Sequence, residues 1–316
     1  MMNRIRSDFF SHCPLLTKLV IPPNIILIEK YAFRSFCFKE VSIPSTTQIE
    51  PDAFPLSLNL RITGDIQFIP KHLFLSNWLL KEITIPSSVT SIGISAFNDC
   101  IYLQKIEFTS PSSLKIIETK AFKKCKELKK ITIPKSVTTI ESYAFIRCKM
   151  LEQLDFESPS SLSVMEGCAF SECQSIKQLT IPPLLTVLNP AVFRKCATIT
   201  QLTIPSSITA IMTGAFTECA KLEQVTFESP SALTHIAESA FSQCTSLKQI
   251  VIPPSVTSIG SYAFYNCLSL EQVTIPRSVV SIGNYAFQKC SSLRKVSIPS
   301  SVTSIGVDAF PSTVQL

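Results

Sequence analysis

Apolar and polar residues follow one repeated order along almost the whole chain. The stretch LKQIVIPPSVTSIGSYAFYNC, Leu247 to Cys267, shows this order most clearly. The Phe of an Ala-Phe pair, or the Phe in its place, marks each copy and recurs at intervals of 20 to 25 residues, at positions 10, 33, 54, 74, 97, 122, 145, 170, 193, 216, 241, 264, 287 and 310. A repeat of this length is one supersecondary unit that buries its apolar face only against neighbouring copies.

The first half of each copy predicts a β-strand. Leu247, Ile250 and Ile252 follow the spacing L-x-x-I-x-I, and the last two side chains point to the same face of a strand because they lie two residues apart. Pro253 follows at once and has no N–H to donate to a sheet. We therefore expect the strand to end there.

The second half predicts turns that carry apolar side chains inward. Val256 and Ile259 lie three residues apart, which suits a tight turn or a short 3₁₀ run. The pair Ala263-Phe264, with Cys267 three residues later, predicts about one helical turn. Each copy therefore contributes one strand and one short connection to the core.

The complete pattern L-x-x-I-x-I-P-x-S-V-x-x-I-x-x-x-A-F-x-x-C resembles the BspA-like class of leucine-rich repeats, most regularly from Lys81 to Phe310. This resemblance implies a leucine-rich-repeat solenoid, a curved horseshoe with a parallel β-sheet on one face and short turns, 3₁₀ or single-turn helices on the other. We expect a single domain over residues 1–316. Its first repeats would occupy residues 1–36, irregular repeats residues 37–73, and regular repeats of 23 or 25 residues would occupy residues 74–316.

Ten of the twelve cysteines share the position three residues after the marker Phe. Asn77 takes this position in one copy, as in other leucine-rich repeats, where Asn or Cys satisfies backbone groups of the turn. Stacked thiols would lie close enough to bridge, but each would have two equivalent neighbours. We therefore favour buried free thiols over a disulfide ladder or a zinc site, which lacks C-x-x-C spacing. Cys37 and Cys168 lie off this position and are the better candidates for reactivity.

No motif for catalysis or for a cofactor is found in the sequence. His12, His72 and His235 fall in different phases of the repeat, so no pair is placed for proton transfer or metal binding. Phosphate-binding glycine loops and G-x-S-x-G are also missing. We expect no catalytic, metal-binding or cofactor-binding residues, and a protein that is not an enzyme.

What the repeats do build is an exposed strand face. The second position after the leading Leu carries six stacked glutamines, and the fourth carries mainly threonines. Glutamines stacked in this way can form amide ladders along a sheet, or they can offer an uncharged floor that recognises protein or glycan. The candidate binding surface comprises Gln153, Gln178, Gln201, Gln224, Gln249, Gln272, Thr180, Thr203, Thr226 and Thr274.

Charge is concentrated in one part of the chain. Between Gln104 and Lys149 lie eleven Lys or Arg and four Glu, a net charge of +7, whereas the whole chain carries +6. Such a belt is either a solvated rim or a docking site for a polyanion such as an acidic glycan. Nucleic acid is disfavoured because no aromatic side chains alternate with the basic ones. The candidate basic patch comprises Lys105, Lys120, Lys123, Lys124, Lys126, Lys129 and Lys130.

Three copies carry two extra residues and a Phe-x-Ser-Pro in place of Ile-Pro, at Phe108, Phe156 and Phe227. The additions fall between strand and turn, so the loops should bulge on one rim without shifting the strand register. They represent either neutral variation or a feature of a binding site at the rim.

The resemblance implies an adhesion or recognition protein at a cell surface that binds host proteins or glycans. The sequence shows no signal peptide, no apolar run long enough for a membrane span and no Asn-x-Ser/Thr sequon. The expected free thiols and the absence of sequons favour the alternative, an intracellular scaffold for protein–protein interaction in the cytoplasm. The predicted partner is a protein, with an acidic glycan as a second ligand class, and the oligomeric state is left open.

Overall fold

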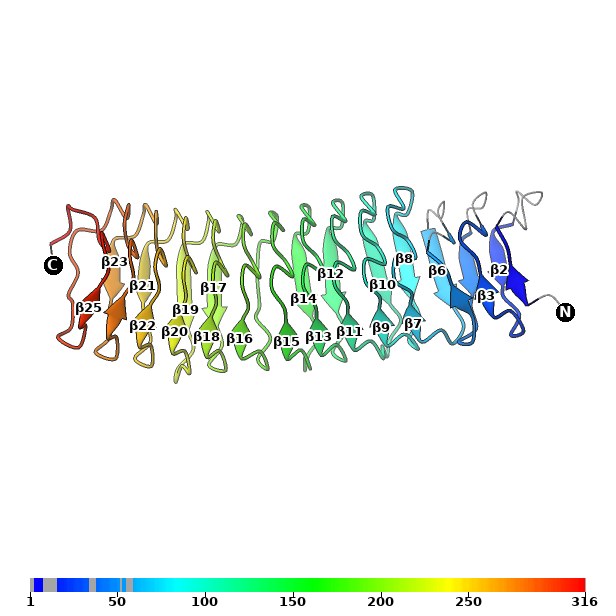
Figure 1. Cartoon of the computed structure of the whole chain (residues 1–316), viewed down its shortest axis with the longest axis horizontal. Coiled ribbons are helices and arrows are strands. Elements are labelled where there is room, and N and C mark those ends of the chain that lie inside the picture. The colour runs from blue at the N-terminus through cyan, green and yellow to red at the C-terminus, as the bar shows by residue number, and fades with distance from the viewer. Residues whose placement is uncertain (1–2, 8–15, 34–37, 52, 55–58, 316) are drawn as a thin grey trace. The chain divides into compact units, whose positions relative to one another are not determined.

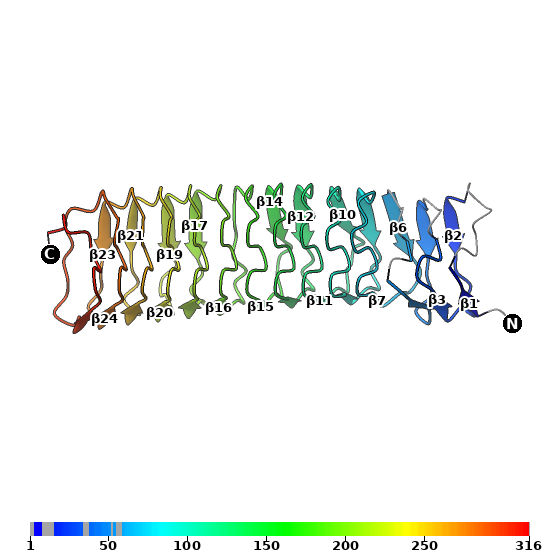
Figure 2. The ribbon, with the colours of Figure 1, turned by 45° about the horizontal axis from the view of Figure 1, so that its top comes forward.

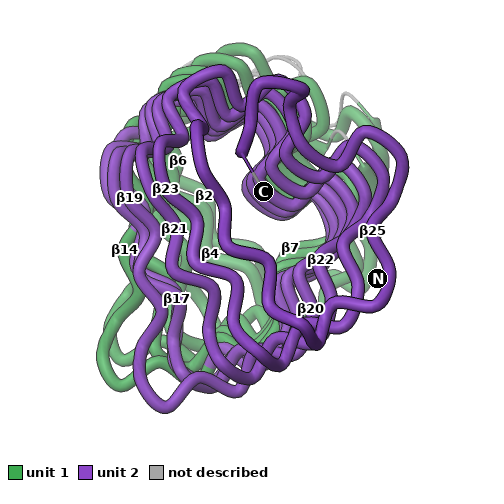
Figure 3. Tube along the Cα trace, turned by 90° about the vertical axis from the view of Figure 1, so that its left-hand side faces the viewer, with its two compact units in different colours: residues 1–151, 155–161 green, residues 152–154, 162–316 purple. Residues whose placement is uncertain are grey.

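A computed structural model describes residues 3–7, 16–33, 38–51, 53–54 and 59–315. Phe10, His12, Cys13 and Cys37 lie outside these residues. The chain divides into two compact units: unit 1 comprises residues 1–151 and 155–161, and unit 2 comprises residues 152–154 and 162–316 (Figure 3). Within each unit the chain winds in successive stacked coils.

Each unit contains two rows of parallel strands, which Figures 1 and 2 show from two sides. In unit 1 the row of longer strands is β2 (Lys18–Val20), β4 (Glu40–Ser42), β6 (Asn59–Thr63), β8 (Glu82–Ile85), β10 (Lys105–Phe108) and β12 (Lys130–Ile133). The second row comprises β1 (Arg4–Ile5), β3 (Leu27–Ile28), β5 (Gln48–Ile49), β7 (Phe68–Ile69), β9 (Ser91–Ile92), β11 (Ile116–Ile117) and β13 (Thr139–Ile140). Strand β14 (Gln153–Phe156) has residues in both units.

Unit 2 has the same two rows. Its longer strands are β17 (Gln201–Ile204), β19 (Gln224–Phe227), β21 (Gln249–Val251) and β23 (Gln272–Thr274), paired in that order. The shorter ones are β15 (Val164–Met165), β16 (Val187–Leu188), β18 (Ala210–Ile211), β20 (His235–Ile236), β22 (Ser258–Ile259), β24 (Ser281–Ile282) and β25 (Ser304–Ile305). The parallel sheets confirm the predicted leucine-rich-repeat solenoid.

The longer strands form where the sequence predicts them. Ile250 and Ile252 are buried, whereas Gln249 and Val251 are exposed, so the side chains alternate between core and solvent. The backbone N–H of Ile252 still donates to a neighbouring strand, at 3.3 Å from the carbonyl of Thr274, and Pro253 follows with no N–H. The proline therefore ends the strand as predicted.

The second row of strands differs from the sequence prediction. We predict a turn or a 3₁₀ run through Val256 and Ile259, but Ser258–Ile259 forms strand β22, which pairs with β20 and β24. The three-residue spacing arises because Val256 ends a preceding turn, in which its N–H donates to Pro253, and Ile259 points inward from the strand. A two-residue strand leaves too short an apolar alternation to be recognised in a sequence.

The anchor segments are turns, and the described residues contain no helix. Most copies place the residues two before and two after the marker Phe at positive φ, as in Tyr262 (58°) and Asn266 (59°) around Phe264. The left-handed conformation reverses the backbone twist and prevents a helix from continuing. The predicted single helical turn is therefore reduced to turns with hydrogen bonds between residues three apart.

The marker phenylalanines form the centre of the core. Phe97 and Phe122 stack with ring centroids 5.0 Å apart, and in unit 2 Phe241 and Phe264 stack at 5.5 Å. These rings are fully buried. Parallel stacking of identical rings follows from the translation of one repeat onto the next, so one sequence position generates a continuous apolar column.

The cysteine position links each repeat to the preceding one. The thiol of Cys219 donates to the carbonyl of Phe193 (3.3 Å), and Cys100 donates to Phe74 (3.0 Å). Asn77 performs the same role through Nδ2, which donates to Phe54 (3.0 Å), while its Oδ1 accepts from the N–H groups of Leu79 and Leu80. The prediction that Asn and Cys satisfy turn backbone groups is confirmed.

The described cysteines are free, and those at this position are buried. They are Cys100, Cys125, Cys148, Cys173, Cys196, Cys219, Cys244, Cys267 and Cys290, whereas Cys168 is partly exposed. Burial raises the pKa of the Cys219 thiol to about 12 and shifts Cys244 in the same direction. The predicted buried free thiols are therefore present throughout the described part of the chain.

Candidate binding surface

The predicted glutamine and threonine positions lie together on the strand face of unit 2. Gln201, Gln224, Gln249 and Gln272 are in register on adjacent strands and are all exposed. Gln153 and Gln178 form an isolated bridge of the same kind. Thr203 pairs with Thr226, and Val251 pairs with Thr274 in the neighbouring row, while Thr180 is also exposed. The predicted positions on β17, β19, β21 and β23 are therefore adjacent in space, and Gln153 and Gln178 are adjacent to each other.

The four stacked amides of Gln201, Gln224, Gln249 and Gln272 do not bond one another. Within the described residues, none of these side chains takes part in a hydrogen bond with a neighbouring amide. Adjacent strands lie about 4.8 Å apart, so these exposed side chains are near neighbours, and their amide groups make no bond with one another.

Two hollows adjoin on this face. The first, of about 400 Å³, is lined by Thr200, Gln201, Glu223, Gln224, Lys248 and Gln249. The second, of about 380 Å³, shares Gln224 and Gln249 and continues past Thr226 and Val251 to the prolines after β21. One side of the second hollow is the lengthened loop that follows Phe227, including Ser229 and Pro230. We name the two together the glutamine groove.

The loop insertions leave the strand register intact. Strand β19 pairs with β17 from Gln201↔Gln224 to Ile204↔Phe227, and β10 pairs with β8 up to Phe108↔Ile85. The Ser229-Pro230 bond is cis, as are the equivalent Ser-Pro bonds of the other two long copies. The prediction that the extra residues do not shift the strand register is confirmed at Phe108 and Phe227, and in unit 2 the lengthened loop walls a hollow.

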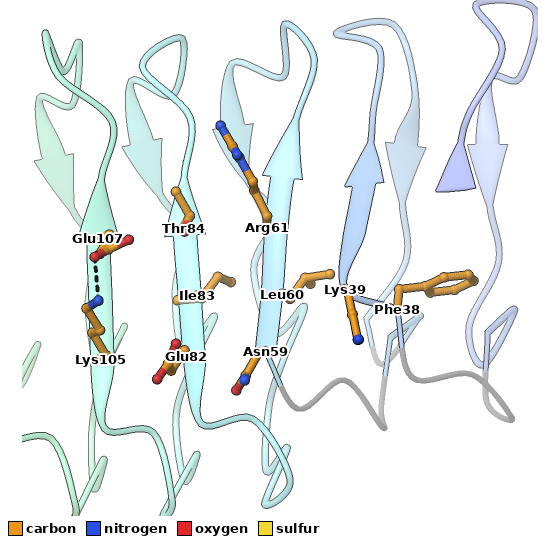
Figure 4. Close-up of a pocket in the computed structure, with 10 residues that line it drawn as sticks. All are labelled: Phe38, Lys39, Asn59, Leu60, Arg61, Glu82, Ile83, Thr84, Lys105 and Glu107. Atoms are coloured by element: carbon orange, nitrogen blue, oxygen red, sulfur yellow. Dashed lines mark ion pairs between the residues drawn. The ribbon is translucent and has the colours of Figure 1, made fainter. Parts of the chain in front are cut away.

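The strand face of unit 1 carries charged groups at the same two rows of positions. Asn59, Glu82 and Lys105 are in register along one row of β6, β8 and β10, and Arg61, Thr84 and Glu107 along the other. These six residues, with Lys39, Leu60, Ile83 and Phe38, line a hollow of about 460 Å³ (Figure 4). Lys105 and Glu107 form an ion pair of 2.6 Å within it.

A second hollow of unit 1, of about 560 Å³, shares Thr84, Lys105 and Glu107 with the first. It extends over β12 to Lys129 and Lys130 and reaches the lengthened loop at Thr109. The two hollows are lined by five basic residues and three acidic ones: Lys39, Arg61, Lys105, Lys129 and Lys130, and Glu82, Glu107 and Glu157. We name them together the charged groove.

The predicted basic patch divides between two places. Lys105, Lys129 and Lys130 line the charged groove, whereas Lys120, Lys123, Lys124 and Lys126 lie in the turns around Phe122. Three of the seven pair with acidic groups: Lys105 with Glu107, Lys124 with Asp99 at 3.2 Å and Lys130 with Asp155 at 3.5 Å. The free positive charge is therefore smaller than the sequence count indicates.

Asn59, Arg61, Glu82 and Thr84 are surface residues that the sequence columns do not include. Glu82 and Thr84 occupy the second and fourth positions after Leu80, so the same spacing identifies them one copy earlier than the columns begin. Asn59 and Arg61 belong to an irregular stretch whose spacing does not show which positions of the repeat they occupy. Pairing with β8 shows that they are equivalent to Glu82 and Thr84.

Three further results concern the described residues outside the grooves as well as within them. Among the described residues, no three His, Cys, Asp or Glu side chains gather as a metal-binding group. His72 and His235 lie in different units. In the described part of the chain no helix has the length and apolar character that crossing a membrane requires.

Comparison with known proteins identifies similar repeats and similar folds. The family model described as BspA type leucine rich repeat region matches residues 3–111, 67–193, 106–223 and 215–316, with six copies. The structure of a leucine-rich repeat protein from Bacteroides ovatus is similar over 99% of this chain and 93% of its own, with 26% sequence identity and a TM-score of 0.62. No curated protein matches the chain.

Two further structures share the fold at lower identity. The pneumococcal vaccine antigen PcpA is similar over 95% of this chain and 89% of its own, with 21% identity and a TM-score of 0.57. A leucine-rich repeat protein from Eubacterium ventriosum is similar over 82% of this chain and 84% of its own, with 22% identity and a TM-score of 0.50.

Proposed function

The chain belongs to the BspA-type leucine-rich repeat family, as its repeat pattern predicts, and we propose that it is a non-enzymatic binding protein of the surface-antigen type. It recognises host or partner proteins, or glycans, through its strand faces and the loops beside them. The observation that carries this proposal is the glutamine groove, where the predicted exposed columns meet a lengthened loop. Side chains on a leucine-rich-repeat strand face can change without altering the core, so recognition is the function such a face serves best.

The test combines location and binding. Antibody labelling of intact source cells, with permeabilised cells as the control, asks whether the protein is displayed. The purified chain is then titrated against a panel of extracellular matrix proteins and glycans. We expect surface labelling and at least one ligand whose binding falls when Gln224 and Gln249 are both replaced by Glu. Labelling only after permeabilisation would reject the adhesin role.

A second candidate function, an intracellular scaffold for partner proteins, is favoured by the cysteines. Thiols such as Cys267 and Cys290 donate to the carbonyls of Phe241 and Phe264 at 3.3 and 3.1 Å, a role that needs the reduced side chain. Titration of the denatured, unreduced protein separates the two candidates. Twelve free thiols fit the scaffold, and several disulfides fit an exported protein.

The remaining expectations stay predictions. They are a single domain over residues 1–316, the absence of catalysis and of cofactors, an acidic glycan as a second ligand class at the basic patch, and the exclusion of nucleic acid. The oligomeric state is measured most directly by light scattering of the purified chain.

A further inference from the structure

The glutamine groove differs in chemistry between its two ends. At one end, Gln201, Gln224 and Gln249 present amides; at the other, the exposed side chains of Val251 and Pro254 present carbon atoms beside the loop at Pro230. Because Gln224 and Gln249 line both hollows, a ligand that occupies one end is in reach of the other. The ligand that fits must therefore be polar over part of its length and apolar at one point.

The charged groups of the groove already have partners within the protein. Lys248 bonds Glu223 at 2.7 Å, and this carboxylate raises the pKa of Lys248. Glu228 accepts from the backbone N–H of Ser206 at 3.0 Å. Among the residues that line the two hollows, all of which the structure describes, these three are the ones with charged side chains. A charged ligand would have to displace an existing contact, so an uncharged ligand is favoured.

The apolar end is exposed where neighbouring copies are polar. Val251 is 64% exposed, in a row whose other members in unit 2 include Thr203, Thr226 and Thr274. Beside it stand the half-buried ring of Phe227 and two successive prolines. Covering a valine of this kind with another apolar side chain is favourable because it removes both surfaces from water.

The polar end matches the main chain of a peptide. Each glutamine amide offers donors and an acceptor, and each peptide group needs one of each. The amides are not engaged with one another, so binding breaks no amide–amide contact. A glycan fits less well at Val251 and Pro254, because a hydroxyl group placed directly against these carbon atoms would lose its hydrogen bonds to water there.

We propose that the glutamine groove binds an extended, uncharged peptide segment of a partner protein, with one apolar side chain of that segment against Val251. The proposal rests on the proposed function and names the class of ligand for one of its surfaces. The glutamines hold the peptide backbone, and the hollow between Val251 and the loop at Pro230 selects the side chain.

The test starts from a random-peptide phage library selected on the immobilised full chain. Enriched peptides are synthesised and titrated by fluorescence anisotropy against the wild type, Val251→Asp and Val280→Asp. Val280 is a matched control, because it is 49% exposed in the same unit and lines neither hollow of the groove. Thermal unfolding checks that both variants are folded, which the exposure of both side chains favours.

We expect enriched peptides without charged residues that share one aliphatic or aromatic side chain. Val251→Asp should weaken their binding about tenfold or more, as expected for an apolar anchor at the centre of an interface, and Val280→Asp should leave it within about twofold. Raising the salt concentration should change the affinity little, since no ion pair forms.

Three results would overturn the inference. They are enrichment of charged peptides, equal affinity of Val251→Asp and wild type, and failure to enrich any peptide. If a neutral glycan array instead gives binding that Val251→Asp abolishes, the strand face binds a ligand and only the peptide assignment fails. If ligands from the matrix panel bind Val251→Asp and Gln224→Glu/Gln249→Glu as tightly as wild type, the glutamine groove has no role in their binding and the proposed function fails for this surface.

Discussion

The two grooves occupy equivalent positions on the repeat and have different chemistry. In unit 1 the second-position row reads Asn59, Glu82, Lys105, and in unit 2 it reads Gln201, Gln224, Gln249. The strands beneath are paired in the same parallel way and bury the same Leu and Ile positions. From this difference we expect the scaffold to fix where a ligand can bind, and the exposed side chains to determine whether that ligand is charged or neutral.

The largest expected effect tests whether the two units share one kind of core. Phe122→Ala in unit 1 and Phe241→Ala in unit 2 each remove a fully buried ring that stacks on both neighbours, so each should lower the free energy of unfolding by about 3–5 kcal/mol. Urea titration followed by circular dichroism and by the fluorescence of Trp78, the single tryptophan, measures both changes.

Trp78 belongs to unit 1, so its fluorescence follows that unit directly. Similar losses in the two variants support equivalent cores. A loss below about 1 kcal/mol in either variant would mean that its ring column tolerates a gap, contrary to the close packing expected of a protein interior.

The second prediction concerns charge in unit 1. Lys120, Lys123 and Lys126 lie in the turns, and no ion pair is described for them, whereas Lys124 pairs with Asp99. Replacing these three with Glu should lower the salt concentration at which the chain elutes from heparin, because polyanion binding depends on free positive charge. Heparin chromatography over a salt gradient measures the shift.

The matched control places the same change in unit 2, where Lys221, Arg277 and Lys289 become Glu. We expect this triple variant to elute closer to the wild type. Equal shifts in both triple variants would show that heparin responds to net charge alone and that the belt is a solvated rim.

The smallest expected effect concerns Glu118 in unit 1. Burial raises the pKa of its carboxyl above the usual range, although the N–H of Ile94 donates to it at 3.0 Å. A carboxyl whose pKa is raised on folding opposes folding at neutral pH, and this cost disappears as pH falls through the folded pKa toward the unfolded value. The equivalent positions of unit 2 include neutral Asn189 and Gly260.

Glu118→Gln should therefore raise the free energy of unfolding at pH 7 by under about 1 kcal/mol, since the group is partly solvated. The gain should shrink on acidification and be small by about pH 4, where the wild-type carboxyl is mostly protonated in both states. Urea titrations at pH 7 and pH 4 measure it, with Glu271→Gln as the control for loss of one charge. A gain in the free energy of unfolding that is the same at both pH values would contradict a raised pKa of the Glu118 carboxyl.

Much of this architecture could be predicted from the sequence because the same pattern of apolar and polar residues recurs in many copies. The L-x-x-I-x-I strand, the terminating proline and the Cys or Asn position are each confirmed by several copies. The second row of strands could not be predicted, since Ser258–Ile259 is too short to show a period. The turns differ from the predicted helical turn because residues such as Tyr262 and Gln243 adopt positive φ, which their side chains do not signal.

The candidate binding surface likewise has some features that the sequence predicts and some that it does not. The columns of Gln and Thr could be predicted because exposure follows from alternation along a strand. The hollows could not, because they depend on how the loop at Pro230 lies beside Val251 and on which lysines find acidic partners. Arg61 was hidden for a different reason, namely that an irregular copy shifts its place in the repeat.

In repeat after repeat, the thiol bonds the Phe carbonyl of the preceding copy, as Cys100, Cys219, Cys267 and Cys290 do. Each copy thus has a side that donates a thiol hydrogen bond and a side that accepts one through a Phe carbonyl. When a whole copy is added or removed inside the array, every thiol donor still meets a Phe carbonyl acceptor. The number of copies is therefore the property that evolution, or an engineer, can change most freely in such an array. Reversing a single copy would instead break the thiol hydrogen bonds at both of its boundaries.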